Sequence, residues 1–263
     1  MKSGLINHIV VFYIRLCIIY AMGIFPKFVH HDLCNTIYPF ILYKRISEQY
    51  NNKDILNLVK GLIPYSILKL YYYDHDLKAV LRWFKADFMM WMPEFLKCKK
   101  CDSEMDSHVI IGSSWKLRAT EIYSCKQCGL EQIFPRYGEI RNIVIARVGR
   151  CSEWSMLFGA ILNSLSIESR LVHDFLDHCW NESLINGNWL HVDSTLEFPI
   201  SFNHPHYYEQ NWGKKYRYVL AFSSDNLEDV TMRYSGQWND VLKRRGQKNV
   251  LYEFRKYIRD YNS

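Results

Sequence analysis

Two C-x2-C pairs constrain the fold of this chain more than any other feature of its sequence. The pairs are Cys98 with Cys101 and Cys125 with Cys128, and 23 residues lie between them. Four thiolates at this spacing are typical of a structural zinc site, in which protein ligands fill all four tetrahedral positions. We therefore expect residues 98–128 to form a small zinc subdomain, with a hairpin-like ribbon around residues 121–123 between the two knuckles.

The remainder of the chain has the composition of an ordinary globular protein. It has 263 residues, of which 49% are apolar and 23% charged, so it can bury a sizeable core. We expect a mainly helical segment over residues 1–75 and a core over residues 76–263 that includes the zinc knuckles. The net charge of +6 is dispersed except at residues 242–248, and no nucleic-acid motif accompanies it, so nucleic acid is not an expected partner.

Cysteine usage indicates a reducing compartment. The cysteines outside the pairs are Cys17, Cys34, Cys151 and Cys179, which do not form a disulfide framework. Free thiols and zinc thiolates both persist in the cytoplasm, so a cytoplasmic location is expected. The apolar segment over residues 5–25 carries Arg15 at its centre, which favours a buried or partner-binding helix over a membrane anchor. A true start at Met22 is a further alternative.

Two helices are predicted around the knuckles. Apolar residues recur at helical spacing over residues 76–92, and Pro93 would end that helix. A second apolar stripe covers residues 151–165 and places Cys151 in its first turn. The positive end of the helix dipole lowers the pKa of a thiol at this position and makes it a better nucleophile. A small buried residue at a helix start is the structural alternative.

Three strands are predicted after the second helix. They cover residues 169–175, 178–184 and 188–195, and a turn at residues 186–187 joins the last two. Antiparallel neighbours would bring His178 close to Asp193, which could fix the tautomer and orientation of the imidazole beside Cys151. His173 and His191 are the rival bases, and we assign them structural roles. By strand alternation Trp189, His191 and Asp193 share one face.

These motifs together resemble one known family. The order of the knuckles, "RYG", "GRCSEW", "DHCWNE", "NWLHVD" and "WGKK" is similar to that of the cytoplasmic peptide:N-glycanases, members of the transglutaminase-like superfamily. The resemblance implies an α+β, papain-like fold with Cys on a helix and His and Asp on an antiparallel sheet. It implies an amidase that deglycosylates misfolded N-glycoproteins bearing high-mannose glycans. Cys151, His178 and Asp193 match its triad, and the four paired cysteines match its zinc ligands.

The resemblance also implies a substrate site and a partner. Trp83 would join the Cys151 backbone N–H in holding the oxyanion, and Trp180, Glu182 and Trp189 would meet the chitobiose end of the glycan. The chain differs from the family in having Ser152 after the nucleophile and Cys179 in place of an aliphatic residue. It has Leu196 where the family has a sugar-contacting acid, a role that Glu197 would have to take. A ubiquitin-receptor shuttle protein of the proteasome pathway is the implied partner.

Other functions use the same residues. A Cys protease or a transglutaminase of this fold would contain the same trio, although no acidic loop suited to calcium is evident. A catalytically silent, zinc-bearing adaptor that binds glycoproteins is the non-enzymatic alternative. The intact Cys, His and Asp weigh against the silent adaptor, and the resemblance favours an amidase with a thioester intermediate among the enzymes.

Overall fold

A computed structural model describes residues 40, 42–74, 77–93, 95 and 97–246. Residues Lys44–Arg244 form one compact unit, and Met1–Tyr43 together with Arg245–Ser263 form the other. The helices α3 (Lys53–Lys60) and α4 (Tyr65–Asp74) belong to the Lys44–Arg244 unit. The boundary expected at residue 75 therefore does not coincide with an end of this unit. The apolar segment 5–25 lies outside the described residues. Within them, no helix is both long and apolar enough to cross a membrane.

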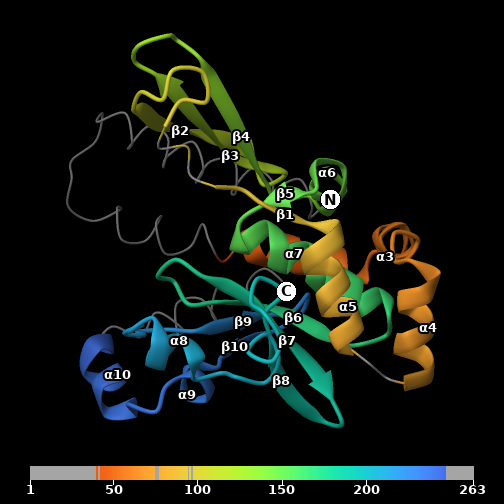
Figure 1. The fold of residues 1–263 in the computed structure, drawn as a ribbon. Coiled ribbons are helices and arrows are strands. Elements are labelled where there is room, and N and C mark those ends of the chain that lie inside the picture. The colour runs from red at the N-terminus through yellow and green to blue at the C-terminus, as the bar shows by residue number, and fades with distance from the viewer. Residues whose placement is uncertain (1–39, 41, 75–76, 94, 96, 247–263) are drawn as a thin grey trace, which may run out of the picture. The chain divides into compact units, whose positions relative to one another are not determined.

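A five-stranded antiparallel sheet forms the centre of the compact unit (Figure 1). Its strands, in spatial order, are β10 (Leu227–Asp229), β9 (Leu220–Phe222), β6 (Ser169–His173), β7 (Cys179–Ile185) and β8 (Asn188–Val192). Asn186 and Gly187 have positive φ angles of 50° and 75°, as the tight turn between β7 and β8 requires. The three predicted strands are therefore confirmed, with His178 and Asp193 just outside their ends.

Helix α7 (Cys151–Ser164) covers one face of this sheet and packs against β6 and β7. Three further helical elements pack against the other sides of α7: the short η1 (Gln49–Asn51), α3 and α6 (Ile140–Ala146). Nearly all of its side chains are buried in consequence, including its serines and Glu153. A helix that is buried all round is fixed in position from several directions, which suits an element that carries a nucleophile.

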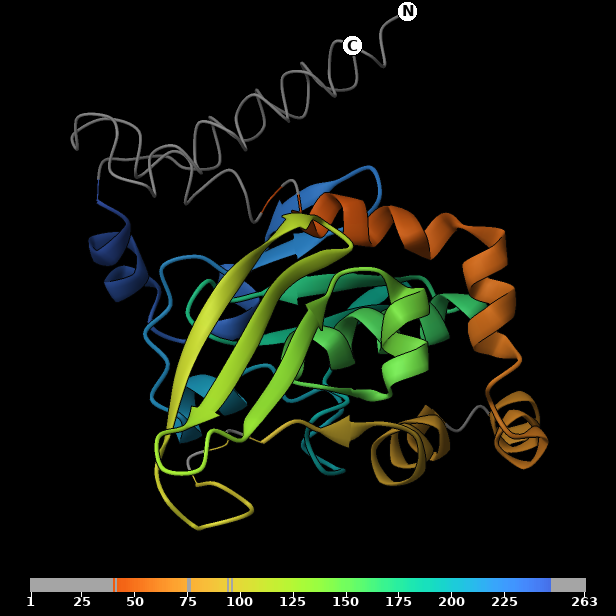
Figure 2. The same cartoon turned by 90° about the horizontal axis from the view of Figure 1, so that it is seen from above.

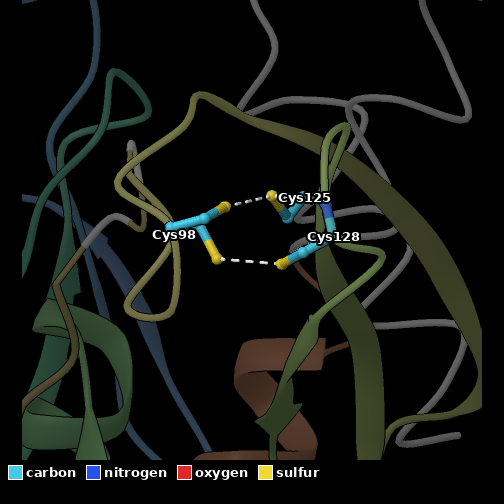
Figure 3. Close-up of side chains that lie close together, drawn as sticks. Cys98, Cys125 and Cys128 are labelled. Carbon is cyan, nitrogen blue, oxygen red and sulfur yellow. Dashed lines mark hydrogen bonds between the residues drawn. The ribbon is translucent and has the colours of Figure 1, made fainter.

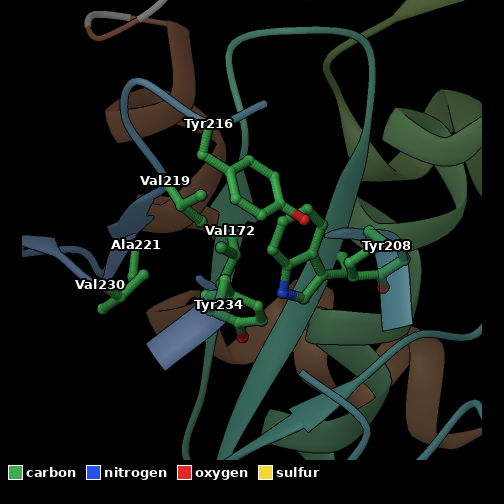
Figure 4. Packing of buried hydrophobic residues seen from close by; sticks show 8 residues of the cluster. Val172, Tyr208, Tyr216, Val219, Ala221, Val230 and Tyr234 are labelled. Carbon is green, nitrogen blue, oxygen red and sulfur yellow. The ribbon is translucent and has the colours of Figure 1, made fainter. Parts of the chain in front are cut away.

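An aromatic cluster covers the opposite face of the sheet (Figure 4). The cluster consists of Val172, Trp180, Tyr208, Tyr216, Val219, Ala221, Val230 and Tyr234. The short helices α8 (Tyr207–Asn211) and α9 (Thr231–Tyr234) supply two of its tyrosines, and α10 (Trp238–Arg245) follows. Because Trp180 pairs directly with Val172, both side chains point to this face of the sheet.

The segment between the knuckles, together with the residues that follow the second knuckle, forms a separate three-stranded antiparallel ribbon (Figure 2). Its strands are β2 (Met105–Ser114), β3 (Leu117–Cys125) and β4 (Glu131–Tyr137), with β3 in the middle. The expected hairpin is therefore present, and β4 extends it by a third strand. The end of β4 leads into α6 and then α7, so the ribbon directly precedes the nucleophile helix.

The helix predicted over residues 76–92 is shorter than expected. Helix α5 covers Leu77–Trp83, one π-helical turn, η2, covers Phe84–Phe88, and Met90–Trp91 is the strand β1. Strand β1 pairs in parallel with β5 (Val148–Gly149), and Met90 N–H donates to Arg147 O at 2.9 Å. These backbone bonds to a distant segment replace those of a further helical turn, so the helix ends five residues before Pro93.

Candidate active site and metal centre

Cys151 is the first residue of α7, where backbone N–H groups lack helical partners. Its Sγ lies 3.6 Å from the carbonyl oxygen of Asp177, in the loop that precedes β7. The thiol is partly exposed, whereas the rest of the first turn of α7 is buried. The predicted position of Cys151 at a helix start is therefore confirmed, and the thiol faces the segment that carries His178.

His178 and Asp193 form a buried pair. The ring Nε2 of His178 lies 2.8 Å from Asp193 Oδ2, and the two residues are 6% and 1% exposed. Because Nε2 is occupied by the carboxylate, Nδ1 is the ring nitrogen left to exchange a proton with the Cys151 thiol. The strand-end positions of His178 and Asp193 thus bring them together as the sequence predicts.

The three groups shift one another's pKa values. The Cys179 thiol and the His178 ring lower the pKa of Cys151 to about 5, in spite of burial. Burial would lower the pKa of His178, but Asp193 and Cys151 raise it to about 10. Burial would raise the pKa of Asp193, but His178 holds it well below its usual range. Near neutral pH the site therefore holds a thiolate beside an imidazolium, the combination that nucleophilic attack and leaving-group protonation require.

A chain of hydrogen bonds fixes the carboxylate of Asp193. The Tyr208 hydroxyl donates to Asp193 Oδ2 at 2.6 Å, and the backbone N–H and the hydroxyl of Thr195 donate to Oδ1. His191 Nε2 lies 2.6 Å from the Tyr208 oxygen, and its Nδ1 accepts from His204 N–H. Burial lowers the pKa of His191 to about 4, so its ring is neutral. His191 is therefore two hydrogen bonds away from the carboxylate of Asp193.

The loop before His178 is ordered by Asp174, which the sequence analysis did not single out. Asp174 Oδ1 accepts backbone hydrogen bonds from Leu176, Asp177 and His178 at 2.9–3.0 Å. Its Oδ2 accepts from Lys214 Nζ at 2.8 Å. In the sequence, this turn could have been recognised from an Asp at the start of a loop, because Asp side chains often accept hydrogen bonds from the backbone N–H groups that follow them. Trp212 lies against the His178 ring at 5.0 Å.

The start of α7 is also anchored to the ribbon by buried ion pairs. Glu153 is fully buried and accepts hydrogen bonds from Arg136 Nε at 3.0 Å, from Arg118 Nη2 and from Arg150 N–H. The Ser152 hydroxyl accepts from the same two ribbon arginines at 2.9 Å. A charge buried this deeply is costly to leave unpaired, so the arginines of β3 and β4 hold the first turn of α7 in place.

A second carboxylate on the ribbon extends this network. Glu121 on β3 pairs with Arg136 at 2.7 Å and with Arg150 at 3.0 Å. The Tyr123 hydroxyl donates to Glu121 at 2.7 Å and accepts from Arg150. Arg150 is the residue immediately before Cys151. The ribbon therefore contacts the nucleophile segment on both sides of the thiol, a connection that the sequence does not indicate.

The four paired cysteines lie together at the end of the ribbon (Figure 3). Their sulfur atoms all lie within 4.8 Å of one another, with Cys98 to Cys128 at 3.5 Å and Cys101 to Cys125 at 3.4 Å. Four sulfurs around zinc at bond lengths of about 2.3 Å have edges of about 3.8 Å, close to these separations. None of these cysteines forms a disulfide, so the cluster is able to hold a metal ion.

The two knuckles have the same backbone shape. In each knuckle a backbone N–H points at the sulfur of the first cysteine. The Lys100 N–H points at Cys98 Sγ, and the Cys128 N–H points at Cys125 Sγ. The fourth residue after each first cysteine, Asp102 or Gly129, has a positive φ and donates its N–H to that cysteine's carbonyl. Backbone N–H groups directed at sulfur stabilise thiolates, which are the form that binds metal.

Comparison with known proteins agrees with this geometry. Residues 113–194 match the family described as the Transglutaminase-like superfamily, a range that includes Cys151, His178 and Asp193. The chain contains a transglutaminase-like domain. The chain is 36% identical over 180 residues to the mouse (Mus musculus) protein named Peptide-N(4)-(N-acetyl-beta-glucosaminyl)asparagine amidase, covering 65% of this chain and 27% of the relative.

Two further relatives of that name come from a nematode and a yeast. The Caenorhabditis briggsae protein is 30% identical over 231 residues, covering 82% of this chain and 37% of the relative. The Yarrowia lipolytica protein is 32% identical over 180 residues, covering 65% of this chain and 49% of the relative. The chain thus spans between about a quarter and a half of the length of these relatives. The amidase name is shared by relatives from mammals, nematodes and a yeast.

A solved structure shares the fold of the transglutaminase-like domain. A chain of the Rad4-Rad23 complex bound to a 6-4 photoproduct UV lesion matches with a TM-score of 0.53 at 15% identity. The match covers 86% of this chain and 53% of that chain. At this identity the likeness concerns the fold alone, and it agrees with the papain-like α+β architecture that the sequence predicts.

Two of the predicted glycan-binding residues of the transglutaminase-like domain lie in its core. Trp180 and Glu182 are both 0% exposed. Glu182 pairs with Arg170 at 2.6 Å and accepts from Tyr234 at 2.8 Å, and Arg233 is a third partner. Every oxygen of Glu182 is already engaged, so this placement does not agree with the expected sugar contact. Strand alternation turned both side chains toward the aromatic cluster, a direction the sequence alone does not give.

The other three predicted substrate residues lie in different surroundings. Trp83 is 6% exposed and packs against Phe88 at 5.0 Å, beside Phe84, which in turn contacts Trp154 of α7. Trp189 is half-buried, with the Arg170 guanidinium 4.0 Å above its ring. The Glu197 side chain is 81% exposed and lies 3.4 Å from Lys85. Of the two predicted acids, only Glu197 presents a carboxylate to solvent.

Proposed function

We propose that this chain is an amidase that releases N-glycans by cleaving the side-chain amide of glycosylated Asn through a thioester on Cys151. The observation that carries the proposal is the buried His178–Asp193 pair at 2.8 Å beside a thiol whose pKa is lowered to about 5. The shared amidase name of the relatives supports the choice of substrate over a peptide bond.

The first half of the proposed reaction forms the thioester. The Cys151 thiolate attacks the amide carbon, and a sulfur–carbon bond forms while the carbonyl oxygen becomes an oxyanion. The backbone N–H of Cys151, which is not used within α7, and the indole of Trp83 are the proposed oxyanion donors. Imidazolium His178 protonates the departing nitrogen as the carbon–nitrogen bond breaks, and the glycosylamine leaves.

The second half returns the enzyme to its starting state. His178, now neutral, takes a proton from water, and the hydroxide attacks the thioester carbon. The carbon–sulfur bond breaks, Cys151 returns to a thiolate, and the peptide carries Asp in place of Asn. The glycosylamine hydrolyses to free sugar and ammonia. Asp193 stabilises the imidazolium in both halves and is not itself protonated.

The four-cysteine cluster is proposed to hold one structural zinc ion. Four thiolates leave no open position for water, so a metal here would not take part in the reaction. Its effect on the site would instead be indirect, because the ribbon carries Arg118, Arg136 and Glu121 to the first turn of α7. Cys98, Cys101, Cys125 and Cys128 are the proposed ligands.

The physiological setting follows from the same proposal. Misfolded N-glycoproteins with high-mannose glycans are the proposed substrates, and the cytoplasm, where thiolates persist, is the proposed location. Exposed Glu197 and half-buried Trp189 are the proposed glycan contacts. A ubiquitin-receptor shuttle protein of the proteasome pathway, as the family resemblance implies, is the proposed partner.

The test is the incubation of reduced protein with a denatured high-mannose glycoprotein in water enriched in heavy oxygen. We expect freed glycan and a peptide that gains about one mass unit from Asn-to-Asp conversion, plus the label in the new carboxylate. Cys151→Ala is the control for the nucleophile. Cleavage of the unglycosylated peptide would indicate a protease, incorporation of an added amine a transglutaminase, and glycopeptide binding without release a silent adaptor.

A further inference from the structure

A second thiol lies beneath the nucleophile. Cys179 is the first residue of β7, directly after His178, and is 2% exposed. Side chains alternate along a strand, so Cys179 and Asn181 share a face. Asn181 Nδ2 would lie 2.8 Å from a Cβ built on Gly159, in the middle of α7. Cys179 therefore points toward α7, on the side of the sheet opposite the aromatic cluster.

Two further contacts bring Cys179 to the N-terminal end of α7. Cys151 Sγ lies 3.6 Å from the carbonyl of Asp177, only two residues before Cys179. The side chain and the backbone N–H of Cys179 are both among the groups that lower the pKa of the Cys151 thiol, which agrees with a position beside its sulfur. The site thus contains two neighbouring thiols, one partly exposed and one buried, and neither is in a disulfide.

We propose that Cys151 and Cys179 are a redox-modification site, at which peroxide oxidises the nucleophile and Cys179 closes a reversible disulfide with it. The proposal rests on the reactive thiolate of the proposed function but not on its glycosylated substrate. The oxidant is hydrogen peroxide or an organic hydroperoxide.

The two steps balance as follows. The Cys151 thiolate attacks the terminal peroxide oxygen, a sulfur–oxygen bond forms and the oxygen–oxygen bond breaks. Hydroxide leaves from hydrogen peroxide, or alkoxide from an organic hydroperoxide; Cys151 becomes a sulfenic acid and the peroxide is reduced. The Cys179 sulfur then attacks the sulfenic sulfur, a sulfur–sulfur bond forms, and the sulfur–oxygen bond breaks. The departing oxygen takes the Cys179 proton and leaves as water. An added dithiol reverses the result by thiol–disulfide exchange.

The position of Cys179 gives this pair a protective role. A sulfenic acid without a neighbouring thiol is oxidised by a second peroxide to sulfinic acid, which a dithiol does not reduce. The family that the chain resembles has an aliphatic residue in place of Cys179, so Cys179→Val is a matched variant that keeps the shape of the buried site and removes the second sulfur. The four cysteines of the cluster at the end of the ribbon can also be oxidised, so their state needs a separate readout.

The experiment treats full-length protein with a molar excess of hydrogen peroxide at neutral pH, followed by peptide mass mapping without reduction. Cys17 and Cys34 are changed to Ser in all samples, and metal release is followed with a chromogenic chelator. We expect a cross-linked peptide joining Cys151 to Cys179, with the loss of two hydrogen atoms, which a dithiol removes. We expect Cys179→Val to carry Cys151 sulfinic acid that a dithiol does not remove.

The outcomes separate this proposal from the amidase. Accumulation of sulfenic or sulfinic acid on Cys151 of the parent protein, with no cross-linked peptide, would overturn the disulfide. The map of the parent protein decides this even where Cys179→Val fails to fold, and equal melting temperatures establish the variant as a fair comparison. Because the readout is mass alone, an absent amidase activity leaves the result unaffected, and a failed cross-link leaves the amidase proposal standing.

Discussion

The four-cysteine cluster and the Cys151 site use the same side chain for opposite purposes. In the cluster, each sulfur lies within 4.8 Å of three others, at the end of a ribbon built from residues adjacent in the sequence. At the site, Cys151 meets the imidazole of the residue just before β7, whose partner carboxylate follows β8. A thiolate surrounded by thiolates is suited to bind metal, and one beside an imidazolium is suited to attack carbon. The surroundings, and not the residue, decide the chemistry.

The two regions also differ in how their geometry is held. The knuckles are local turns whose backbone N–H groups point at their own sulfurs. The nucleophile is positioned by long-range contacts, including those of Arg118 and Arg136 of the ribbon with Glu153. Damage to the cluster should therefore spread to the active site, whereas damage to the triad should stay where it is. The following predictions test this asymmetry, from the largest expected effect to the smallest.

Replacement of one cluster cysteine should have the largest effect. Structural zinc sites supply roughly 10–16 kcal/mol of binding free energy, comparable to the whole stability of a domain. Cys98→Ser should therefore lose metal, unfold the ribbon and slow alkylation of Cys151, as read by metal analysis, circular dichroism and a labelled thiol reagent. Cys179→Ser, which alters a buried cysteine outside the cluster, is the control for metal content. Full metal content with an unchanged melting curve in Cys98→Ser would contradict the asymmetry.

Replacement of the orienting carboxylate should abolish activity without unfolding. Asp193→Asn keeps the size of the side chain but removes the charge that holds His178 as an imidazolium, and the same change in a serine triad costs about 10⁴ in turnover. Glycan release should fall by that order while metal content and melting temperature change little. His173→Gln is a control at another histidine; His191 is unsuitable because it contacts Tyr208. A loss of less than tenfold would remove Asp193 from the triad.

The pH dependence of the site should differ from that of an ordinary thiol. The pKa of Cys151 is lowered to about 5, so its alkylation should rise as the pH rises through about 5. The pKa of His178 is raised to about 10, so protonation of the leaving group, and with it glycan release, should fall as the pH rises through about 10. A stopped-flow alkylation profile with its midpoint near the value of a free thiol would show that the ion pair does not form.

Removal of the buried charge at the ribbon contact should destabilise the fold to an intermediate degree. Glu153→Gln leaves two arginines facing a neutral amide, and breaking a buried pair of this kind costs about 3–5 kcal/mol. The loss should appear in urea unfolding monitored by tryptophan fluorescence, together with slower alkylation of Cys151. Glu131→Gln, at an exposed carboxylate of the ribbon, is the matched control. Equal stability of the two variants would mean that the network does not anchor α7.

The two acids predicted from the sequence as sugar contacts, Glu197 and Glu182, should give different effects when each is replaced. Glu197 lies 3.4 Å from Lys85 with 81% of its side chain exposed, and surface pairs of this kind contribute at most about 1 kcal/mol. Glu197→Gln should leave the melting temperature nearly unchanged and raise KM for a glycopeptide. Glu182→Gln should instead lower the melting temperature, because it removes a charge from a fully buried cluster. The opposite pattern would return the glycan contact to Glu182.

Elements specified by local pattern were predicted well. The apolar stripe of α7, the knuckles and the Asn186–Gly187 turn follow from periodicity and turn chemistry. The helix over residues 76–92 was predicted too long because Met90–Trp91 bonds to Val148–Gly149. Such a pairing joins residues far apart in the sequence, and no local propensity reports it.

By itself, the sequence determined the chemical groups and their order along the chain, and with them the four-cysteine cluster and the three proposed members of the triad. Only the tertiary structure decided which side chains meet: that Glu182 is enclosed by arginines, that Asp174 orders the loop of His178, and that Cys179 is buried. The physical reason is range. Turns and amphipathic periods are set by neighbouring residues, whereas burial and charge pairing depend on how α7, the sheet and the ribbon pack together.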